Sequence, residues 1–193
     1  MKRCLLLSLF TIFSLTIAGC QTRSHPQENR PEAWLKAGTK VELPPPGITP
    51  PFSSQQMLTG HFQGKSQSLL VLLNADQHKL TLAGLSPVGI RLFLLTYDRL
   101  GIHSEQSLVV PHLPPASQVL ADVMLSFYPV SVWQKQLPEK WTLLDEGMVR
   151  RLIDPDNQTI TKIDYMLIHG KRVPISITQQ AFHYQITMQY LND

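Results

Sequence analysis

The sequence contains few charged residues, few cysteines and only a small excess of basic over acidic residues. Each of these shortages excludes a class of protein. Only 16% of the 193 residues are charged and 43% are hydrophobic, which is the opposite of a disordered composition. The formal net charge of +3 is too small for the basic face of a nucleic-acid-binding protein. Two cysteines allow one disulfide at most, so a single domain of this length must be held by an apolar core.

Catalytic and metal-binding patterns are also lacking. The sequence contains no G-x-S-x-G elbow, no H-E-x-x-H pair and no glycine-rich phosphate loop. The seven histidines are scattered along the chain. Carboxylates near expected turns, such as Asp145, Glu146 and Asp154, are more typical of a solvated rim than of a converging acid pair. We therefore expect a protein that is not an enzyme and that uses no cofactor and no metal.

The first twenty residues resemble a bacterial lipoprotein signal. Lys2 and Arg3 precede an apolar run of about 13 residues, whereas a transmembrane helix needs about 20. The run ends in a small-residue motif closed by Cys20, and this motif is similar to a lipobox. The resemblance implies cleavage before Cys20 and addition of palmitate-type acyl chains to it. An ordinary secretory signal with a chance cysteine is the alternative.

The residue after Cys20 bears on the destination of the chain. Two or three acyl chains would anchor a protein stably to a membrane. Position 21 is Gln and not Asp, which in enterobacterial-type lipoprotein sorting implies the outer membrane. We therefore expect a lipid-anchored protein on the periplasmic face of that membrane.

The stretch between Cys20 and the body is rich in proline. Seven of the 15 prolines fall within residues 21–54, and proline favours extended polyproline II backbone. We predict a stand-off tether over residues 20–54, with a short helix near residues 31–40 that packs on the body. A partner-binding proline-rich motif is the alternative. The predicted organisation is a signal peptide at 1–19, a lipidated tether at 20–54 and one domain at 55–193.

The body has the period-two alternation of a mainly β (α+β) domain. In the last expected strand, apolar Tyr184, Ile186, Met188 and Tyr190 alternate with polar residues, as in a half-buried antiparallel strand. Short turns between the strands indicate antiparallel neighbours. The expected strands are 57–63, 66–74, 79–84, 89–98, 102–110, 163–167, 173–177 and 183–190, with further strand residues around Arg150 and Arg151. For these two arginines a cross-strand ion pair is the favoured prediction, and binding of a ligand headgroup is the alternative.

A helical insert separates the two blocks of strands. Ser117 is the expected N-cap, and Asp122 falls opposite the apolar side of the helix, where it would face solvent or a turn amide. A second short helical turn is expected around Trp133. The order of elements predicts a curved antiparallel sheet of about ten strands that forms an incomplete half-barrel, with the insert as its lid. A closed barrel is the alternative.

Several segments carry a resemblance to known lipoproteins. Residues 80–94, with the turn Gly84-Leu85-Ser86-Pro87-Val88-Gly89, resemble a strand–turn–strand of the outer-membrane lipoprotein receptor LolB. Residues 57–191, including Leu120-Ala121-Asp122-Val123 and Phe127-Tyr128-Pro129, resemble a family of small lipoproteins from aryl-polyene lipid gene clusters. Both resemblances imply a LolA/LolB-like half-barrel whose apolar concave face holds acyl chains.

The resemblance and the strand pattern together predict a binding module. We expect it to accept a lipid, a polyene lipid or the acyl chains of a lipoprotein, with a periplasmic LolA-like carrier or an exporter as its partner. The alternative is a non-catalytic assembly lipoprotein with a filled core. The expected membrane-insertion loop contains Leu85, Pro87 and Val88. The expected cargo-binding residues are Leu80, Leu82, Leu92, Leu94, Val123, Met124, Phe127, Trp133, Tyr184 and Ile186.

Overall fold

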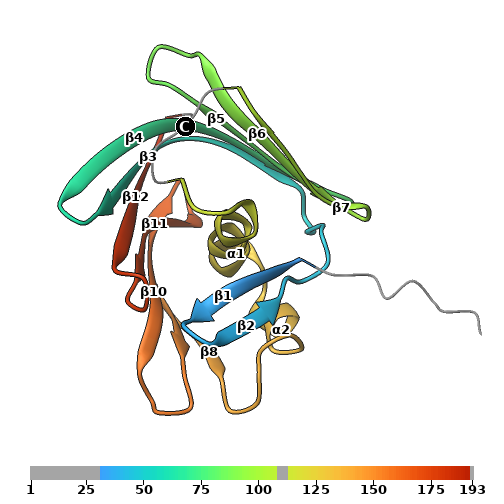
Figure 1. Ribbon diagram of the computed structural model, residues 1–193, viewed down its shortest axis with the longest axis vertical. Helices are drawn as coiled ribbons and strands as arrows, with labels where there is room; N and C mark the ends of the chain where they lie inside the picture. Colours follow the sequence, from blue (N-terminus) through green and yellow to red (C-terminus); the bar gives the residue numbers. More distant parts are fainter. Residues whose placement is uncertain (1–30, 108–112, 192–193) are drawn as a thin grey trace, which may run out of the picture.

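One antiparallel sheet of ten strands dominates the computed structural model, which describes residues 31–107 and 113–191 (Figure 1). The strands lie in the order β7-β6-β5-β4-β3-β12-β11-β10-β9-β8, so the two halves of the chain meet where β3 pairs with β12. Edges β7 and β8 do not pair with each other. The prediction of an incomplete half-barrel of about ten strands is confirmed, and the closed barrel is excluded. The strands are β3 (Phe52–Phe62), β4 (Lys65–Ala75), β5 (Leu80–Leu85), β6 (Arg91–Asp98), β7 (Gly101–Gln106), β8 (Thr142–Glu146), β9 (Val149–Ile153), β10 (Thr159–Ile168), β11 (Lys171–Gln179) and β12 (Tyr184–Tyr190).

The helical insert lies inside the curve of this sheet. Helix α1 (Ala116–Phe127) is followed at once by the single turn α2 (Val130–Trp133). The predicted N-cap was wrong: Pro115 occupies that position without a side-chain hydrogen bond, and Ser117 lies within the first turn. Leu120, Met124 and Leu125 of α1 are buried in the core. Within the described ranges, no helix is long and apolar enough to cross a membrane.

A hairpin occupies part of the predicted tether. Strands β1 (Glu32–Lys36) and β2 (Thr39–Glu42) pair with each other, and the residues Ala33, Leu35, Val41 and Leu43 are at most 3% exposed. Of the tether predicted over residues 20–54, the part from residue 31 onward is therefore folded. Residues 31–40 pack on the body as expected, but the prediction of a short helix there was wrong, because they form strands. A period-two apolar pattern within a proline-rich stretch makes the hairpin, because each strand buries one face. Residues 1–30, with the expected signal, Cys20 and the start of the tether, lie outside the described residues.

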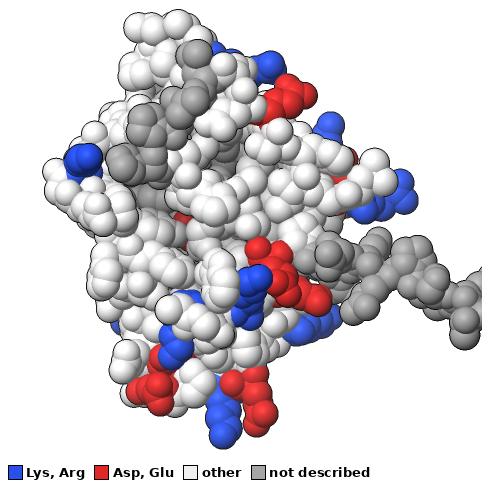
Figure 2. All heavy atoms as spheres, in the orientation of Figure 1, with Lys and Arg blue, Asp and Glu red and all other residues white. Residues whose placement is uncertain are grey.

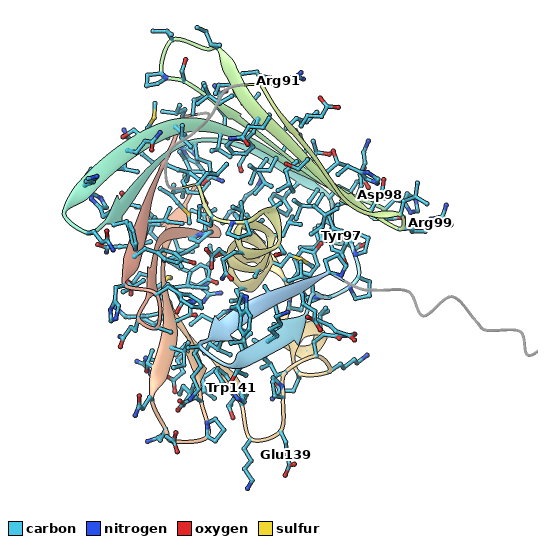
Figure 3. The ribbon with its side chains drawn as sticks, in the orientation of Figure 1. Arg91, Tyr97, Asp98, Arg99, Glu139 and Trp141 are labelled. Carbon is cyan, nitrogen blue, oxygen red and sulfur yellow. The ribbon has the colours of Figure 1, made fainter. Side chains whose placement is uncertain are left out.

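The prolines after β2 form an ordered connection across the open side of the half-barrel. Tyr97 points inward from β6 and its hydroxyl donates to the carbonyl oxygen of Pro44 at 2.9 Å, whereas Arg91, Asp98 and Arg99 lie toward the outside (Figure 3). The amide of Gly47 donates to the Tyr128 hydroxyl at 3.2 Å. Gly47 has a φ of +106°, and a Cβ there would collide with the backbone carbonyl of Gln77. This connection leads directly into β3, so the folded body begins near residue 31 and not at residue 55.

Candidate binding cavity

A cavity of about 1060 Å³ lies between α1 and the concave face of the sheet. Its strand wall is formed by Leu58 of β3, Leu69 of β4 and Met188 of β12, which are direct neighbours in the register. Val123 and Phe127 of α1 form the opposite wall. The volume is at the upper end of small-molecule sites, which are about 300–1,000 Å³ and mostly apolar. The space suits one long apolar molecule or several short ones.

The rim of the cavity is polar. His61 and Lys65, at the β3–β4 end, are exposed. Glu32 and Lys40 reach the rim from the β1–β2 hairpin, where they form a 3.1 Å ion pair that is also exposed. Figure 2 shows that Lys, Arg, Asp and Glu are sparse over much of this face of the molecule and gather toward its lower and right edges. An apolar interior and a polar rim are the usual arrangement of a site for an amphiphile.

One acidic residue interrupts the apolar wall. Asp122 of α1 is only 3% exposed, and the Tyr184 hydroxyl donates to its Oδ2 at 2.6 Å. The amide of Gln118, one turn earlier on α1, also hydrogen-bonds this hydroxyl. The other carboxylate oxygen, Oδ1, is buried without a hydrogen-bond partner. The expectation that Asp122 faces solvent or a turn amide was wrong: α1 is surrounded by the half-barrel, so Asp122 is buried, and its partner is the Tyr184 hydroxyl.

Burial changes the titration of this pair. Removal from water disfavours the charged carboxylate and raises the pKa of Asp122 to about 7, although the hydrogen bond from Tyr184 works against the rise. Burial, together with the neighbouring Asp122, also raises the pKa of the Tyr184 hydroxyl above its ordinary value. Tyr184 therefore keeps its proton, and that proton is already donated to Asp122.

A second buried polar group lines the cavity on β3. Gln56 is 3% exposed, and its Nε2 donates to the Ser54 hydroxyl at 2.8 Å while its Oε1 has no partner. The register places Tyr184 opposite Phe62, six residues from Gln56 along β3. At about 3.4 Å per residue, the backbones at these two positions are roughly 20 Å apart. Apolar side chains such as Leu58 and Ile186 line the wall between them.

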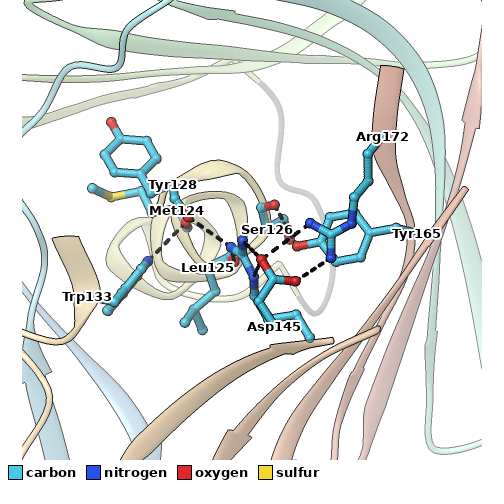
Figure 4. Close-up of polar contacts among 9 residues, drawn as sticks. Met124, Leu125, Ser126, Tyr128, Trp133, Asp145, Tyr165 and Arg172 are labelled. Atoms are coloured by element: carbon cyan, nitrogen blue, oxygen red, sulfur yellow. Dashed lines mark hydrogen bonds and ion pairs between the residues drawn. The ribbon is translucent and has the colours of Figure 1, made fainter. Parts of the chain in front are cut away.

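The carboxyl end of α1 is fixed by side chains from other elements (Figure 4). The indole of Trp133 donates to the carbonyl of Met124 at 3.0 Å, and the Tyr165 hydroxyl donates to that of Ser126 at 2.8 Å. Arg150 donates to the carbonyls of Leu125 and Tyr128 at 2.6 and 2.8 Å. The last carbonyls of a helix have no partners within it, so these contacts hold one end of the cavity lid in place.

Arg150 also forms the predicted cross-strand ion pair. Its direct partner in the register is Asp145 of β8, which Arg172 contacts as well. Partial burial by itself would raise the pKa of Asp145, but the hydrogen bonds from Arg150 and Arg172 outweigh it and hold this pKa below its usual value. Neighbouring Arg151 pairs with Glu146 at 2.8 Å on the surface. Neither Arg150 nor Arg151 lines the cavity, so the alternative of a headgroup-binding arginine is not realised.

The structure brings half of the predicted cargo-binding residues to the cavity. Leu82, Val123, Phe127, Tyr184 and Ile186 line it. The assignment was wrong for Leu80, Met124 and Trp133, which are completely buried in the core and have no free surface.

The assignment was also wrong for Leu92 and Leu94, which are on β6. Leu94 pairs with Ala83, so it lies on the convex face, opposite the buried row of Phe93 and Leu95. Leu92 lies at a break in the register beside Gly84 and Leu85, where the regular alternation is interrupted.

The predicted membrane-insertion loop is an exposed turn between β5 and β6. Val88 is 82% exposed, and Ile90, which the sequence analysis did not select, is 55% exposed. Pro87 is exposed as well, but Leu85 is only partly exposed at the end of β5. The Ser86 hydroxyl accepts a hydrogen bond from the Ile90 amide at 3.2 Å. The turn is thus internally bonded and presents two aliphatic side chains outward.

Sequence reasoning missed several cavity residues. Leu58, Leu69, Val71 and Met188 alternate along their strands, so the period-two pattern shows that they share a face, but no pattern tells that this face is left partly unfilled. Gln56 gave no signal, because one of two adjacent glutamines in β3 is unremarkable until its burial is known. Within the described residues, no group of three or more His, Cys, Asp or Glu side chains is placed to hold a metal ion.

Comparison with known proteins gives a family and no described function. The model of a family described as "Protein of unknown function (DUF3261)" matches residues 53–192, which is most of the chain and includes every strand of the large sheet except the first residue of β3. No match is found among curated proteins.

Proposed function

The chain belongs to the DUF3261 family, and we propose that this member is a binding protein whose cavity accepts the apolar chain of a lipid, a polyene lipid or a lipoprotein. The observation that carries the proposal is the largely apolar cavity of about 1060 Å³ beneath α1. Transfer of apolar groups from water contributes about 0.8 kcal/mol per methylene. A long chain would therefore bind tightly without a charged anchor and without any chemical step.

The rival interpretation of an assembly lipoprotein depends on a filled core. The side chains of β3, β4 and β12 that face α1 leave a cavity large enough for a ligand. A protein that used its sheet only as a scaffold would gain stability from filling this space, because cavities in cores are destabilising. The open volume thus supports cargo binding over a purely structural role.

We also propose that the protein is anchored to the outer membrane, on its periplasmic face, through acyl chains on Cys20. The support is the lipobox-like motif and Gln21 in the sequence. Val88 and Ile90, exposed on one turn, supply a second contact with a lipid surface. A LolA-like carrier or an exporter would deliver the cargo, which would move toward the cavity of higher affinity. Incorporation of labelled palmitate into the wild type, and not into Cys20→Ala, tests the anchor.

The cavity itself is tested with a fluorescent acyl-chain probe and two matched variants. Val123→Trp places an indole inside the cavity and is expected to weaken probe binding at least tenfold. Leu94→Trp introduces the same ring on the convex face of β6 and should leave the affinity unchanged. Thermal unfolding confirms that both variants fold, with Val123→Phe as the milder replacement. Equal binding by all of the variants, or no binding by the wild type, would refute the proposal.

A further inference from the structure

The buried carboxylate of Asp122 in the cavity wall limits the kind of molecule that the cavity binds. Asp122 is buried, belongs to the lining and has one carboxylate oxygen, Oδ1, without a hydrogen-bond partner. An unpaired buried acceptor costs about 1–3 kcal/mol. Oδ1 itself has almost no surface open to the cavity, so a ligand reaches it by turning the Asp122 side chain toward the cavity. A ligand that then supplies a donor would recover that free energy, and a purely hydrocarbon ligand would not.

The neighbours of Asp122 decide which chemistry fits. The Tyr184 hydroxyl already donates to Oδ2, and Gln118 hydrogen-bonds the same hydroxyl. An ionised carboxylate only accepts hydrogen bonds, whereas a protonated carboxyl also donates one. When Asp122 is ionised, the group that this cluster still needs is therefore a donor.

A negatively charged headgroup does not suit this position. Among the described lining residues, the basic side chains Lys40 and Lys65 are exposed at the rim, and none is buried beside Asp122. Arg150, the buried arginine, is bound to Asp145 and to carbonyls of α1, and it does not line the cavity. A phosphate or carboxylate placed against Asp122 would meet a like charge in a dry site.

Resting on the proposed function, we propose that the cargo is a hydroxyl-bearing amphiphile: its apolar chain fills the cavity, and its hydroxyl donates a hydrogen bond to Asp122 Oδ1 beside Tyr184. A phospholipid-type head, by contrast, would remain at the rim with Lys65 and His61. This assigns the selectivity of the cavity to one buried carboxylate in a largely apolar wall.

The test compares two ligands whose oxygen carries either a hydrogen or a methyl group. Hexadecan-1-ol and hexadecyl methyl ether share a chain and an oxygen, but only the alcohol donates a hydrogen bond. Each competes with the fluorescent acyl probe for the chain from residue 20 onward, which contains the whole described fold. The measurement is made at pH 8, where Asp122 is mostly ionised. The wild type should prefer the alcohol by roughly tenfold, as expected for one hydrogen bond.

Two variants separate a specific hydrogen bond from general packing. In Asp122→Asn the Tyr184 hydroxyl donates to the amide oxygen, which leaves the NH₂ group where Oδ1 was, so the preference should disappear or reverse toward the ether. Val123→Ala, which trims an apolar lining residue, should change both affinities and leave their ratio as in the wild type.

The possible outcomes are distinct. If both ligands bind the wild type equally, or if Asp122→Asn keeps the preference for the alcohol, the inference is overturned and the proposed function stands. If the probe binds but neither ligand displaces it, the inference alone is overturned. If the probe itself does not bind, the proposed function fails and the inference fails with it.

Discussion

At the scale of the residue, Asp122 is the group whose environment departs most from what its type prefers. Carboxylates are rarely fully buried without a charged partner, and Asp122 has only the Tyr184 hydroxyl and one free oxygen. Because Asp122 lies in the cavity wall, a ligand with a hydrogen-bond donor would pair with the free oxygen and offset the free-energy cost of burying it. Because Asp122 is buried only in the folded state, its titration makes the stability of the fold depend on pH.

Asp122 should make the protein less stable as the pH rises toward neutral. Its pKa rises from 3.8 to about 7 on folding, so between these values the folded state binds the proton more tightly than the unfolded state. The free energy of unfolding should therefore fall between pH 4.5 and pH 7.5, by a few kcal/mol at most. Urea unfolding at several pH values measures this change.

The variant Asp122→Asn isolates the contribution of this carboxyl group. Its curve of stability against pH should be flatter over the same range, whereas the surface variant Glu139→Gln should follow the wild type. Asp145 and Asp154 have lowered pKa values, so their contributions are lost below about pH 4 and do not overlap this window. Parallel curves for the wild type and Asp122→Asn would contradict the assigned environment.

At the scale of the element, the β1–β2 hairpin and helix α1 complete what the sheet leaves open. The hairpin contributes a row of buried apolar residues, and Lys36 reaches across to Asp154 at 2.7 Å. Helix α1 is bound at its carboxyl end by Trp133, Arg150 and Tyr165. Two elements, the β1–β2 hairpin and α1, therefore cover the concave face of the sheet, and each is fixed to the rest of the domain by the contacts named above.

The hairpin should be part of the cooperative fold. Leu35→Ala removes a side chain that is 1% exposed and should lower the free energy of unfolding by about 2–5 kcal/mol. Glu32→Gln, which breaks an exposed ion pair on the same strand, should change it by less than about 1 kcal/mol. If Leu35→Ala had no effect in urea unfolding, these residues would be a tether after all.

The anchor of α1 should depend on the buried arginine and not on its neighbour. Arg150→Met leaves the carbonyls of Leu125 and Tyr128 and the carboxylate of Asp145 without this partner, and it should cost about 3–5 kcal/mol of stability. Arg151→Met removes a surface pair with Glu146 and should cost less than about 1 kcal/mol. Similar losses in the two variants, measured by thermal or urea unfolding, would contradict this account.

At the scale of the whole molecule, the fold class and most strands follow from the sequence, because alternation and short turns determine antiparallel neighbours. The hairpin was missed because prolines dominate the composition around it, although Ala33, Leu35, Val41 and Leu43 alternate. The face of β6 was misassigned because both of its rows are apolar, Leu92 and Leu94 against Phe93, Leu95 and Tyr97. Periodicity pairs residues on a face but leaves open which apolar face turns inward.

The cavity and the buried Asp122 in its wall could not be predicted from the sequence pattern. The cavity is the space that the side chains of β3, β4, β12 and α1 leave unfilled between them. Its volume depends on the packing of all four elements, so the pattern within one segment does not predict it. Asp122 was placed in solvent because a helical projection assumes one wet side, whereas the curved sheet surrounds α1. The buried polar residues of the cavity were thus the least accessible to sequence reasoning.

Mass spectrometry of the purified protein shows whether the cavity holds an apolar cargo. The full-length chain is extracted with organic solvent after gentle purification. We expect a near-stoichiometric long-chain molecule that carries a hydroxyl group, strongly depleted in Val123→Trp and retained in Leu94→Trp. An extract free of any such molecule, or one with the same lipids in both variants, would contradict it.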